Sequence, residues 1–230
     1  MVRKTEIQIE EINIEIQRKK IKNLHLRVYP PDGCVRVSAP LRFSDDAIRS
    51  FAASKIDWIR KNRDRIRERN PQISYEFRSG ESHFYSGSCY RLELIEQDTK
   101  PHVEIDGQML KLYVRPEAEA DKRKAVMDEF YRGQLKKALP GIIARWEKEM
   151  KVKVNEFGVK RMKTKWGTCN RKARRIWINL ELAKKPPECL DYIVVHEMVH
   201  LLERYHNSVF YGHMDHFLPQ WRTYKSILNP

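Results

Sequence analysis

Apolar residues alternate with polar residues over most of the first forty positions of the chain. The alternation covers residues 7–16, with a change of phase at Glu10-Glu11 that predicts a bulge or turn between two half-buried strands. It returns over residues 24–28 and 35–39, on either side of a Pro-Pro-Asp-Gly sequence that is typical of a hairpin turn. The pattern predicts a small, mostly antiparallel sheet.

A helical period replaces the alternation after this sheet. Ser44 suits an N-cap, the first turn is acidic, and apolar residues recur at helical spacing until Asn70-Pro71. This predicts one long helix over about residues 44–69. Four further strands are then predicted, separated by Gly87, Asp106-Gly107 and similar turns, over residues 82–84, 90–96, 102–105 and 109–114.

The second half of the chain combines helical and strand patterns. Residues 116–150 predict a long helix or two, because Pro140-Gly141 marks a kink or a break. Three short strands are predicted next, over residues 154–159, 162–164 and 175–180. They lead to a strongly apolar segment, residues 188–202, which is predicted to be a helix. Pro186-Pro187, directly before it, prevent an earlier helix start.

This apolar helix contains the motif H-E-x-x-H. The four-residue spacing places His196 and His200 on one face, so both imidazoles can reach a single metal ion. Glu197 then lies beside the ion, where it can take a proton from a metal-bound water, as a zinc hydrolase requires. The alternative is a pair of structural histidines bonded to backbone. Two histidines and a glutamate in a buried helix are costly unless something such as a metal satisfies them.

A third ligand is expected at His206. On a straight helix this residue would point about 240° away from His200, so the chain must leave the helix between them. Glu203 stands where a glycine would ease that turn, so an ordinary residue must make it. His213, Asp215 and His216, on the next helical stretch, are alternative third ligands.

Charge and cysteine content add expectations about partners and surroundings. The net charge of +14 is concentrated in basic clusters, which favours a nucleic acid or another polyanion as partner, although a solvated helix face would look similar. No run approaches the roughly 18 apolar residues of a membrane span, so a cytoplasmic protein without membrane contact is expected. The four cysteines stand singly and are expected to be reduced thiols, with Cys169 in packing: Cys34, Cys89, Cys169 and Cys189.

Several motifs resemble one family of proteins. The segment Arg161-Met162-Lys163-Thr164-Lys165-Trp166-Gly167-Thr168-Cys169, then Ile178-Asn179-Leu180, the H-E-x-x-H motif and His206 resemble the YgjP-like metal-dependent hydrolases, which are related to SprT-like and minimal gluzincin-type proteases. The resemblance covers most of the chain, including a Trp-Gly-Thr-Cys turn and the tail from His213 to Trp221. Glu203 in place of a glycine, and the lack of a Met-turn, separate the chain from metzincins.

The resemblance implies a zinc-binding peptidase-like domain behind a β-rich extension. His196, His200 and His206 would bind one zinc ion, and Glu197 would be the general base. SprT-like relatives act on proteins bound to DNA, which fits the basic charge. The expected fold is α+β: a mostly antiparallel β-rich region with one long helix over residues 1–115, then a zincin-like catalytic domain over residues 116–230 with a helix, a small sheet and the H-E-x-x-H helix.

The expected activity is zinc-dependent hydrolysis of a peptide or protein. A second electrophile usually stabilises the oxyanion, and four residues are candidates for this or for substrate contact: Arg161, Lys165, Tyr205 and Tyr211. One alternative is a metal-dependent hydrolase of nucleoside triphosphates, although no phosphate-binding glycine loop is present. Another is a non-catalytic, DNA-associated module whose zinc is structural, in which Glu197 would have no use as a base.

Overall fold

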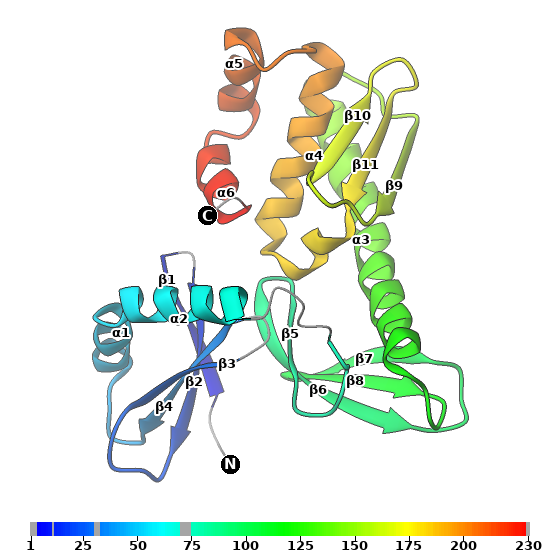
Figure 1. The fold of residues 1–230 in the computed structure, drawn as a ribbon. Coiled ribbons are helices and arrows are strands. Elements are labelled where there is room, and N and C mark those ends of the chain that lie inside the picture. Colours follow the sequence, from blue (N-terminus) through cyan, green and yellow to red (C-terminus); the bar gives the residue numbers. More distant parts are fainter. Residues whose placement is uncertain (1–3, 11, 30–32, 70–74, 229–230) are drawn as a thin grey trace. The chain divides into compact units, whose positions relative to one another are not determined.

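The computed structural model describes residues 4–10, 12–29, 33–69 and 75–228, and its fold is α+β, as predicted (Figure 1). The chain divides into two compact units. The N-terminal unit lies within residues 1–84 and 88–126, and the C-terminal unit comprises residues 85–87 and 127–230. No helix among the described residues is long and apolar enough to cross a membrane.

The first sheet of the N-terminal unit confirms the strands predicted from alternation. Its order is β1-β2-β4-β3, with one parallel pair, β2 and β4, between two antiparallel pairs. The phase change is a tight turn, because Ile9 pairs with Ile12 and Glu10 has a φ of 51°. Glu11 and the predicted turn at residues 30–32 lie outside the described residues. The strands are β1 Lys4–Ile9, β2 Ile12–Lys19, β3 His25–Tyr29 and β4 Cys34–Pro40.

The predicted long helix is two helices, α1 Asp45–Ala53 and α2 Ile56–Arg69. Ser44 caps α1 as predicted, accepting a hydrogen bond from the backbone N–H of Ala47 at 3.2 Å. The first helix ends before Ser54. The hydroxyl of Ser54 donates a hydrogen bond to the carbonyl of Phe51 and so competes with the regular helical hydrogen bonds. The apolar period continues across the break because buried residues of both helices pack in one core with the sheet, among them Ile14, Ile16, Val37, Ile48, Ala52 and Ile59.

The second sheet confirms the next four predicted strands, in the order β5-β6-β8-β7. Strands β6 and β8 are parallel, and β7 pairs antiparallel with β8. Leu92, Leu110 and Leu112 are fully buried and form part of its apolar side. The strands are β5 Ser82–Tyr85, β6 Ser88–Glu96, β7 His102–Asp106 and β8 Met109–Val114.

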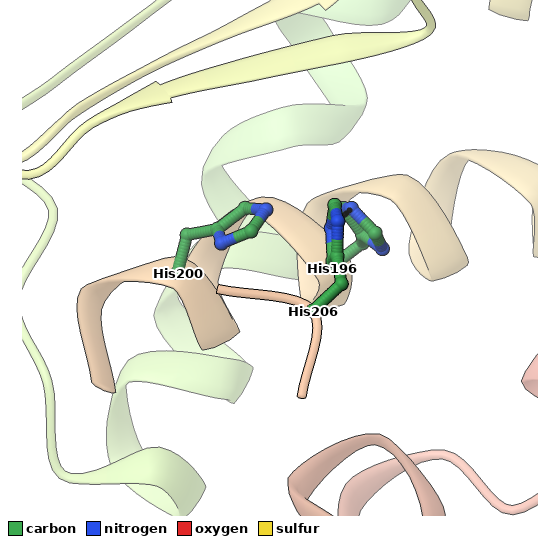
Figure 2. A group of neighbouring side chains, drawn as sticks. All are labelled: His196, His200 and His206. Atoms are coloured by element: carbon green, nitrogen blue, oxygen red, sulfur yellow. Dashed lines mark hydrogen bonds between the residues drawn. The ribbon is translucent and has the colours of Figure 1, made fainter. Parts of the chain in front are cut away.

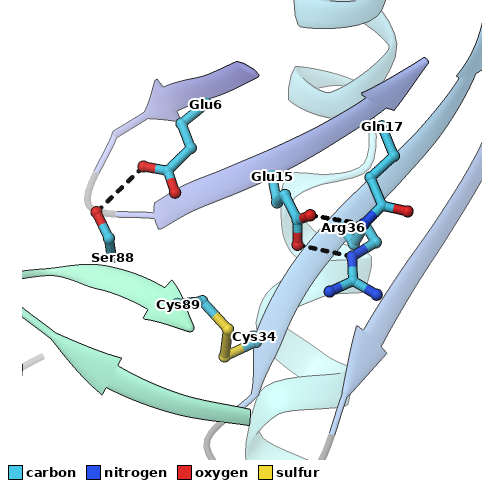
Figure 3. The surroundings of a disulfide bond; sticks show 7 residues. All are labelled: Glu6, Glu15, Gln17, Cys34, Arg36, Ser88 and Cys89. Carbon is cyan, nitrogen blue, oxygen red and sulfur yellow. Dashed lines mark hydrogen bonds and ion pairs between the residues drawn. A yellow bond between two sulfur atoms is a disulfide. The ribbon is translucent and has the colours of Figure 1, made fainter. Parts of the chain in front are cut away.

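A disulfide joins the two sheets, which corrects the expectation of four reduced cysteines. Cys34 at the start of β4 bonds to Cys89 in β6, with the Cα atoms 6.1 Å apart (Figure 3). The two cysteines are 55 residues apart in the chain, so their spacing gave no sign of the pairing. Ser88 adds a hydrogen bond to Glu6 of β1 at 3.1 Å. Cys169 and Cys189 are free thiols.

The C-terminal unit is built around a long helix, a three-stranded sheet and a buried helix. The long helix, α3 Ala120–Met150, runs without a break through Pro140. Pro140 is exposed, so it does not interrupt the apolar stripe of the helix. Because proline has no backbone N–H, the helix loses one hydrogen bond there. The stripe consists of Met127, Tyr131, Leu135, Leu139, Ile143, Trp146 and Met150.

The three-stranded sheet has the order β10-β11-β9, with β10 at its edge. Its strands are β9 Glu156–Lys160, β10 Gly167–Asn170 and β11 Arg175–Asn179. The strand predicted at residues 162–164 is wrong, and the Trp-Gly-Thr-Cys sequence enters β10 instead of forming a turn. A 3-10 helix over Leu180–Lys184 follows, then α4 Pro187–Leu202, α5 Ser208–Phe217 and α6 Trp221–Leu228.

Candidate metal centre

Helix α4 supplies two of the candidate ligands. It starts at Pro187, directly after Pro186, as the two prolines predict. Most of its residues are buried, and His196 and His200 are partly buried on a shared face, with ring centroids 5.1 Å apart.

The third histidine is returned to this face by the five residues that link α4 to α5. Glu203 is extended, with φ −127° and ψ 128°, and ends the helix at Leu202. Its carboxylate accepts from the N–H of Tyr205 at 3.0 Å, and the side chain of Asn207 caps α5 by accepting from the N–H of Phe210 at 3.0 Å. We call residues 203–207 the connector. An ordinary residue makes the turn, as the sequence requires.

The three imidazoles converge on one point (Figure 2). One ligand atom from each of His196, His200 and His206 lies within 4.8 Å of the others. The Nε2 atoms of His196 and His206 are 3.1 Å apart, close to the roughly 3.3 Å between two nitrogens bound to one zinc ion at about 2.0–2.1 Å. Among the described residues, no other cluster of His, Cys, Asp or Glu has this geometry.

The hydrogen bonding of His200 favours metal binding. Its Nδ1 lies 3.2 Å from the carbonyl oxygen of Glu203. A carbonyl can only accept, so Nδ1 carries the proton and Nε2 keeps a lone pair for a metal. The extended Glu203 therefore both ends the helix and orients a candidate ligand.

Phe210 packs against all three imidazoles. It is fully buried, and its ring centroid lies 5.0 Å from that of His196, 4.8 Å from His200 and 4.6 Å from His206. The sequence gave no sign of this role, because a phenylalanine on a helix usually packs in an ordinary core. The alternative ligands on α5 are not in the cluster: Asp215, for example, accepts from Trp221 Nε1 at 2.8 Å and pairs with Arg222.

The electrostatics of the site favour the neutral forms of His196 and His200. Burial, together with the positive charges that His200, His206 and Lys225 can carry, lowers the pKa of His196 to about 3. Burial also lowers the pKa of His200. Neutral imidazole is the form that binds a metal ion, so these shifts suit the cluster to a cation.

Glu197 lies next to the cluster and is only 5% exposed. Burial raises the pKa of its carboxyl to about 8, against the opposing effect of the positive charge of Lys165. Strand β10 passes directly over it: a Cβ added to Gly167 would lie 2.7 Å from Glu197 Oε1 and 2.9 Å from Ile193 Cγ2. Only glycine allows this close approach.

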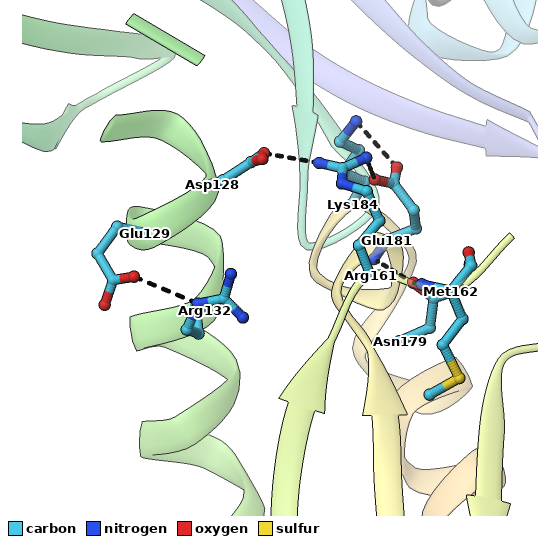
Figure 4. Close-up of polar contacts among 8 residues, drawn as sticks. All are labelled: Asp128, Glu129, Arg132, Arg161, Met162, Asn179, Glu181 and Lys184. Carbon is cyan, nitrogen blue, oxygen red and sulfur yellow. Dashed lines mark hydrogen bonds and ion pairs between the residues drawn. The ribbon is translucent and has the colours of Figure 1, made fainter. Parts of the chain in front are cut away.

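Asn179 holds the segment that precedes Gly167 (Figure 4). It is 4% exposed, and its side-chain amide donates to the carbonyls of Met162 at 3.0 Å and Lys165 at 2.7 Å. Its side-chain oxygen accepts from the N–H of Met162 at 3.3 Å and of Glu181 at 3.2 Å. The asparagine of the Ile-Asn-Leu motif therefore positions β10 above the metal centre.

Of the four candidates for contact with the oxyanion or substrate, two line the cleft at the candidate metal centre and two do not. Arg161 pairs with Asp128 at 2.7 Å and Glu181 at 2.5 Å and does not line the cleft at the metal centre (Figure 4). Tyr205 is 63% exposed and also lies outside the lining. Lys165 and Tyr211 do line the cleft. Two carboxylates explain why Arg161 is held away.

The cleft has a volume of about 1250 Å³ and lies wholly within the C-terminal unit. It contains the three histidines, Glu197, the residues of β10, and aromatic side chains including Tyr192 and Trp221.

A match to a known family covers the whole C-terminal unit: the model of the YgjP-like metallopeptidase domain matches residues 22–230. The chain belongs to the YgjP-like family.

One solved structure is similar to part of this YgjP-like chain. It is the crystal structure of the metallopeptidase zymogen of Pyrococcus abyssi abylysin, which is 20% identical and covers 38% of this chain and 86% of its own, with a TM-score of 0.34. No curated protein matches the chain. The YgjP-like protein thus has a metallopeptidase-like domain with three histidines that can hold a metal ion.

Proposed function

We propose that this YgjP-like protein is a zinc-dependent metallopeptidase with Glu197 as its general base. One observation carries the proposal: three histidines converge beside a buried glutamate, and no fourth His, Cys, Asp or Glu of the described residues completes the cluster. Structural zinc sites have four protein ligands, whereas catalytic sites have three and an open position. This argues against the alternative of a structural zinc.

The residues present fit a zinc ion, because imidazole nitrogens are among its preferred ligands and three of them converge here. When bound, zinc supplies a Lewis acid for the scissile carbonyl and lowers the pKa of a water at the open position. A bound cation would favour the ionised form of the Glu197 carboxyl, whose pKa burial raises to about 8. Glu197 then accepts the proton of the attacking water and delivers it to the leaving amine as the C–N bond breaks.

Strand β10 supplies a place for the peptide. It is an edge strand of its sheet and lines the cleft from Gly167 to Asn170. An extended peptide can add to such an edge through backbone hydrogen bonds, which would bring a peptide bond to Glu197. Lys165 and Tyr211 line the same cleft and are the remaining candidates for contact with the oxyanion.

Replacement of the general base tests this function. Glu197→Gln should retain zinc and lose peptide hydrolysis by roughly 10²–10⁴-fold, because the amide cannot accept the proton. Zinc content and the rate of cleavage of a quenched fluorescent peptide library are measured for both proteins. Glu188→Gln, an exposed substitution in the first turn of the same helix, is the control. Full activity of Glu197→Gln would exclude the general-base role.

Hydrolysis of nucleoside triphosphates is a second candidate, favoured by the many lysines and arginines that line the cleft. The same proteins are assayed for phosphate release. Release by the parent but not by Glu197→Gln, without any peptide cleavage, would favour this candidate.

We also propose that substrates include proteins bound to DNA, a suggestion supported by the net charge of +14. Cleavage of a DNA-binding protein should increase when duplex DNA is added at low salt, and the increase should disappear at high salt.

A further inference from the structure

The charged side chains that line the cleft at the candidate metal centre are almost all positive. Eight lysines and arginines line it, and among the described residues Glu197 is its single acidic group. Glu197 is buried beneath β10, so the accessible charge of the cleft is positive. The eight are Lys151, Lys153, Lys165, Arg171, Lys172, Arg174, Arg204 and Lys225.

Five of these residues gather at one end of the three-stranded sheet. Arg171, Lys172 and Arg174 form the turn between β10 and β11, and Lys151 and Lys153 lie between α3 and β9. The two segments are joined by a hydrogen bond from the backbone N–H of Asn155 to the carbonyl of Arg174, at 2.8 Å. We call these five residues the turn cluster.

The three cations of the turn form no ion pair within the described part of the chain, and the carboxylate of Glu203 interacts with Arg171 only at longer range. No carboxylate pairs with Arg171, Lys172 or Arg174, and all three are exposed. Several acidic residues of the unit pair with other cations, for example Glu156 with Arg175 at 3.2 Å and Asp128 with Arg161 at 2.7 Å. Lys153 alone of the cluster has an ion pair, with Glu147 at 2.8 Å.

The turn cluster has a fixed place relative to the general base. Gly167, at the start of β10, lies over Glu197, and the strand ends at Asn170, immediately before Arg171. A strand advances about 3.3 Å per residue, so the turn begins roughly four residues, or about 13 Å, along the edge from Glu197. A peptide added to this edge keeps the same spacing, so side chains three to five positions from the cleaved bond would reach the cluster.

We propose that the turn cluster is a specificity subsite that selects peptide segments carrying Asp or Glu about three to five positions from the cleaved bond. The proposal rests on the proposed peptidase function and names its class of substrate. Complementary charge in a partly enclosed cleft raises both the rate of encounter and the affinity for an acidic peptide.

The aromatic side chains of the cleft favour a peptide over a single-stranded nucleic acid. Binding of single strands relies on bases stacked on open aromatic faces. Trp221 is buried and stacked, with ring centroids 6.4 Å from Tyr192 and 5.5 Å from Tyr211. Trp166 has the ammonium group of Lys185 5.5 Å from its ring centroid. Trp221 is thus engaged in packing and Trp166 has a cation beside its ring, while the cations of the turn cluster follow a strand edge that suits a peptide.

The test compares peptides that differ only in charge. Peptides share one cleavable centre and carry Glu, Gln or Lys at three to five positions on either side. For the zinc-loaded parent, kcat/KM should be roughly tenfold higher for the Glu peptide than for the Gln peptide at low salt, lower still for Lys, and the difference should shrink at high salt.

Matched variants locate the effect. The triple variant Arg171→Gln, Lys172→Gln, Arg174→Gln should lower the Glu-to-Gln ratio of kcat/KM to near one. The control, Lys136→Gln, Lys137→Gln, Lys148→Gln, removes the same charge from exposed positions of α3 outside the cleft and should leave the ratio unchanged. Equal ratios in the two variants, or equal cleavage of Glu and Gln peptides by the parent, would overturn the proposal.

Direct binding separates this proposal from the peptidase assignment. Zinc-loaded Glu197→Gln is titrated with the labelled Glu and Gln peptides, with a nucleoside triphosphate and a DNA oligonucleotide as competitors. Tighter binding of the Glu peptide, lost in the turn-cluster variant, supports the subsite even if the parent cleaves no peptide. Preferential binding of the triphosphate or oligonucleotide at these residues would overturn it.

Discussion

Gly167 and Glu197 show how closely two distant residues meet at the metal centre. A methyl group on Gly167 has no room, because Glu197 Oε1 and Ile193 Cγ2 lie 2.7 Å and 2.9 Å from its position. The glycine thus permits β10 to lie on the buried carboxyl group. The backbone of Gly167 is not in the left-handed region, so the need is one of space.

Gly167→Ala should therefore damage the site without removing a ligand. We expect a loss of about 1–3 kcal/mol in the free energy of unfolding, from overpacking, and a large loss of peptide hydrolysis with zinc retained. Thermal unfolding, zinc content and activity are measured together. Gly212→Ala, in α5 with nothing within 4 Å, is the control and should be neutral or slightly stabilising. A fully active Gly167→Ala protein would show that the close approach has no functional importance.

At the residue scale, the sequence was sufficient to predict the candidate site residues that lie on one helix, because helical spacing alone brings them together. His196, Glu197 and His200 could be read from a four-residue interval. Phe210 could not, because its role depends on neighbours from other elements. The basic run from Arg171 to Arg175 was visible in the sequence, but its position at the cleft was not. Arg161 was suggested by its place in a motif, but two carboxylates hold it outside the cleft.

At the scale of elements, the connector between α4 and α5 decides whether His206 meets the other two histidines. Its ends are fixed by Glu203, which leaves the helical conformation, and by Asn207, which caps α5. Hydrogen bonds to backbone at both ends restrict the position of the ligand between them. The affinity for metal should therefore depend on residues that do not contact it.

Asn207→Ala tests the role of the connector. Loss of the cap should cost about 1 kcal/mol of stability and weaken zinc binding by roughly tenfold, because His206 becomes less well positioned. Zinc affinity is measured by competition with a chelator. Ser44→Ala, which removes the equivalent cap of α1, should lower stability but leave zinc affinity unchanged. Equal zinc affinity in both variants would contradict a positioning role for Asn207.

The errors in the predicted elements have local physical causes. The predicted long helix breaks at Ser54 while the apolar period runs on, so periodicity alone could not reveal the break. Pro140 suggested a kink or a break, and of the two helices that a break would give, the structure has one, because the exposed proline does not end the helix. Strand β10 was placed too early, because its glycine and small polar residues resemble a turn when the partner strand and Glu197 are not known.

At the scale of the whole molecule, the disulfide and the metal centre belong to different compact units. Cys34 and Cys89 lie in the N-terminal unit, and the three histidines lie in the C-terminal unit. A substitution that removes the disulfide should therefore lower the stability of the N-terminal unit without changing metal binding by the C-terminal unit.

Removal of the disulfide tests this separation. Cys34→Ser with Cys89→Ser should lower the free energy of unfolding of the N-terminal unit by about 2–4 kcal/mol, because the bond closes a long loop of chain. Zinc content should remain at the level of the parent. Urea unfolding with and without reductant measures the effect, and reductant should not change the double variant. A parent protein unaffected by reductant would show that the bond does not contribute to stability.

The most direct test of the three-histidine site is elemental analysis of the purified protein beside two single variants. His206→Ala removes the ligand that the connector supplies, and His213→Ala removes a histidine of α5 outside the cluster. We predict about one zinc per chain in the parent and in His213→Ala, and a large loss in His206→Ala. A parent without metal after zinc is supplied, or zinc lost from His213→Ala and kept by His206→Ala, would contradict the assignment.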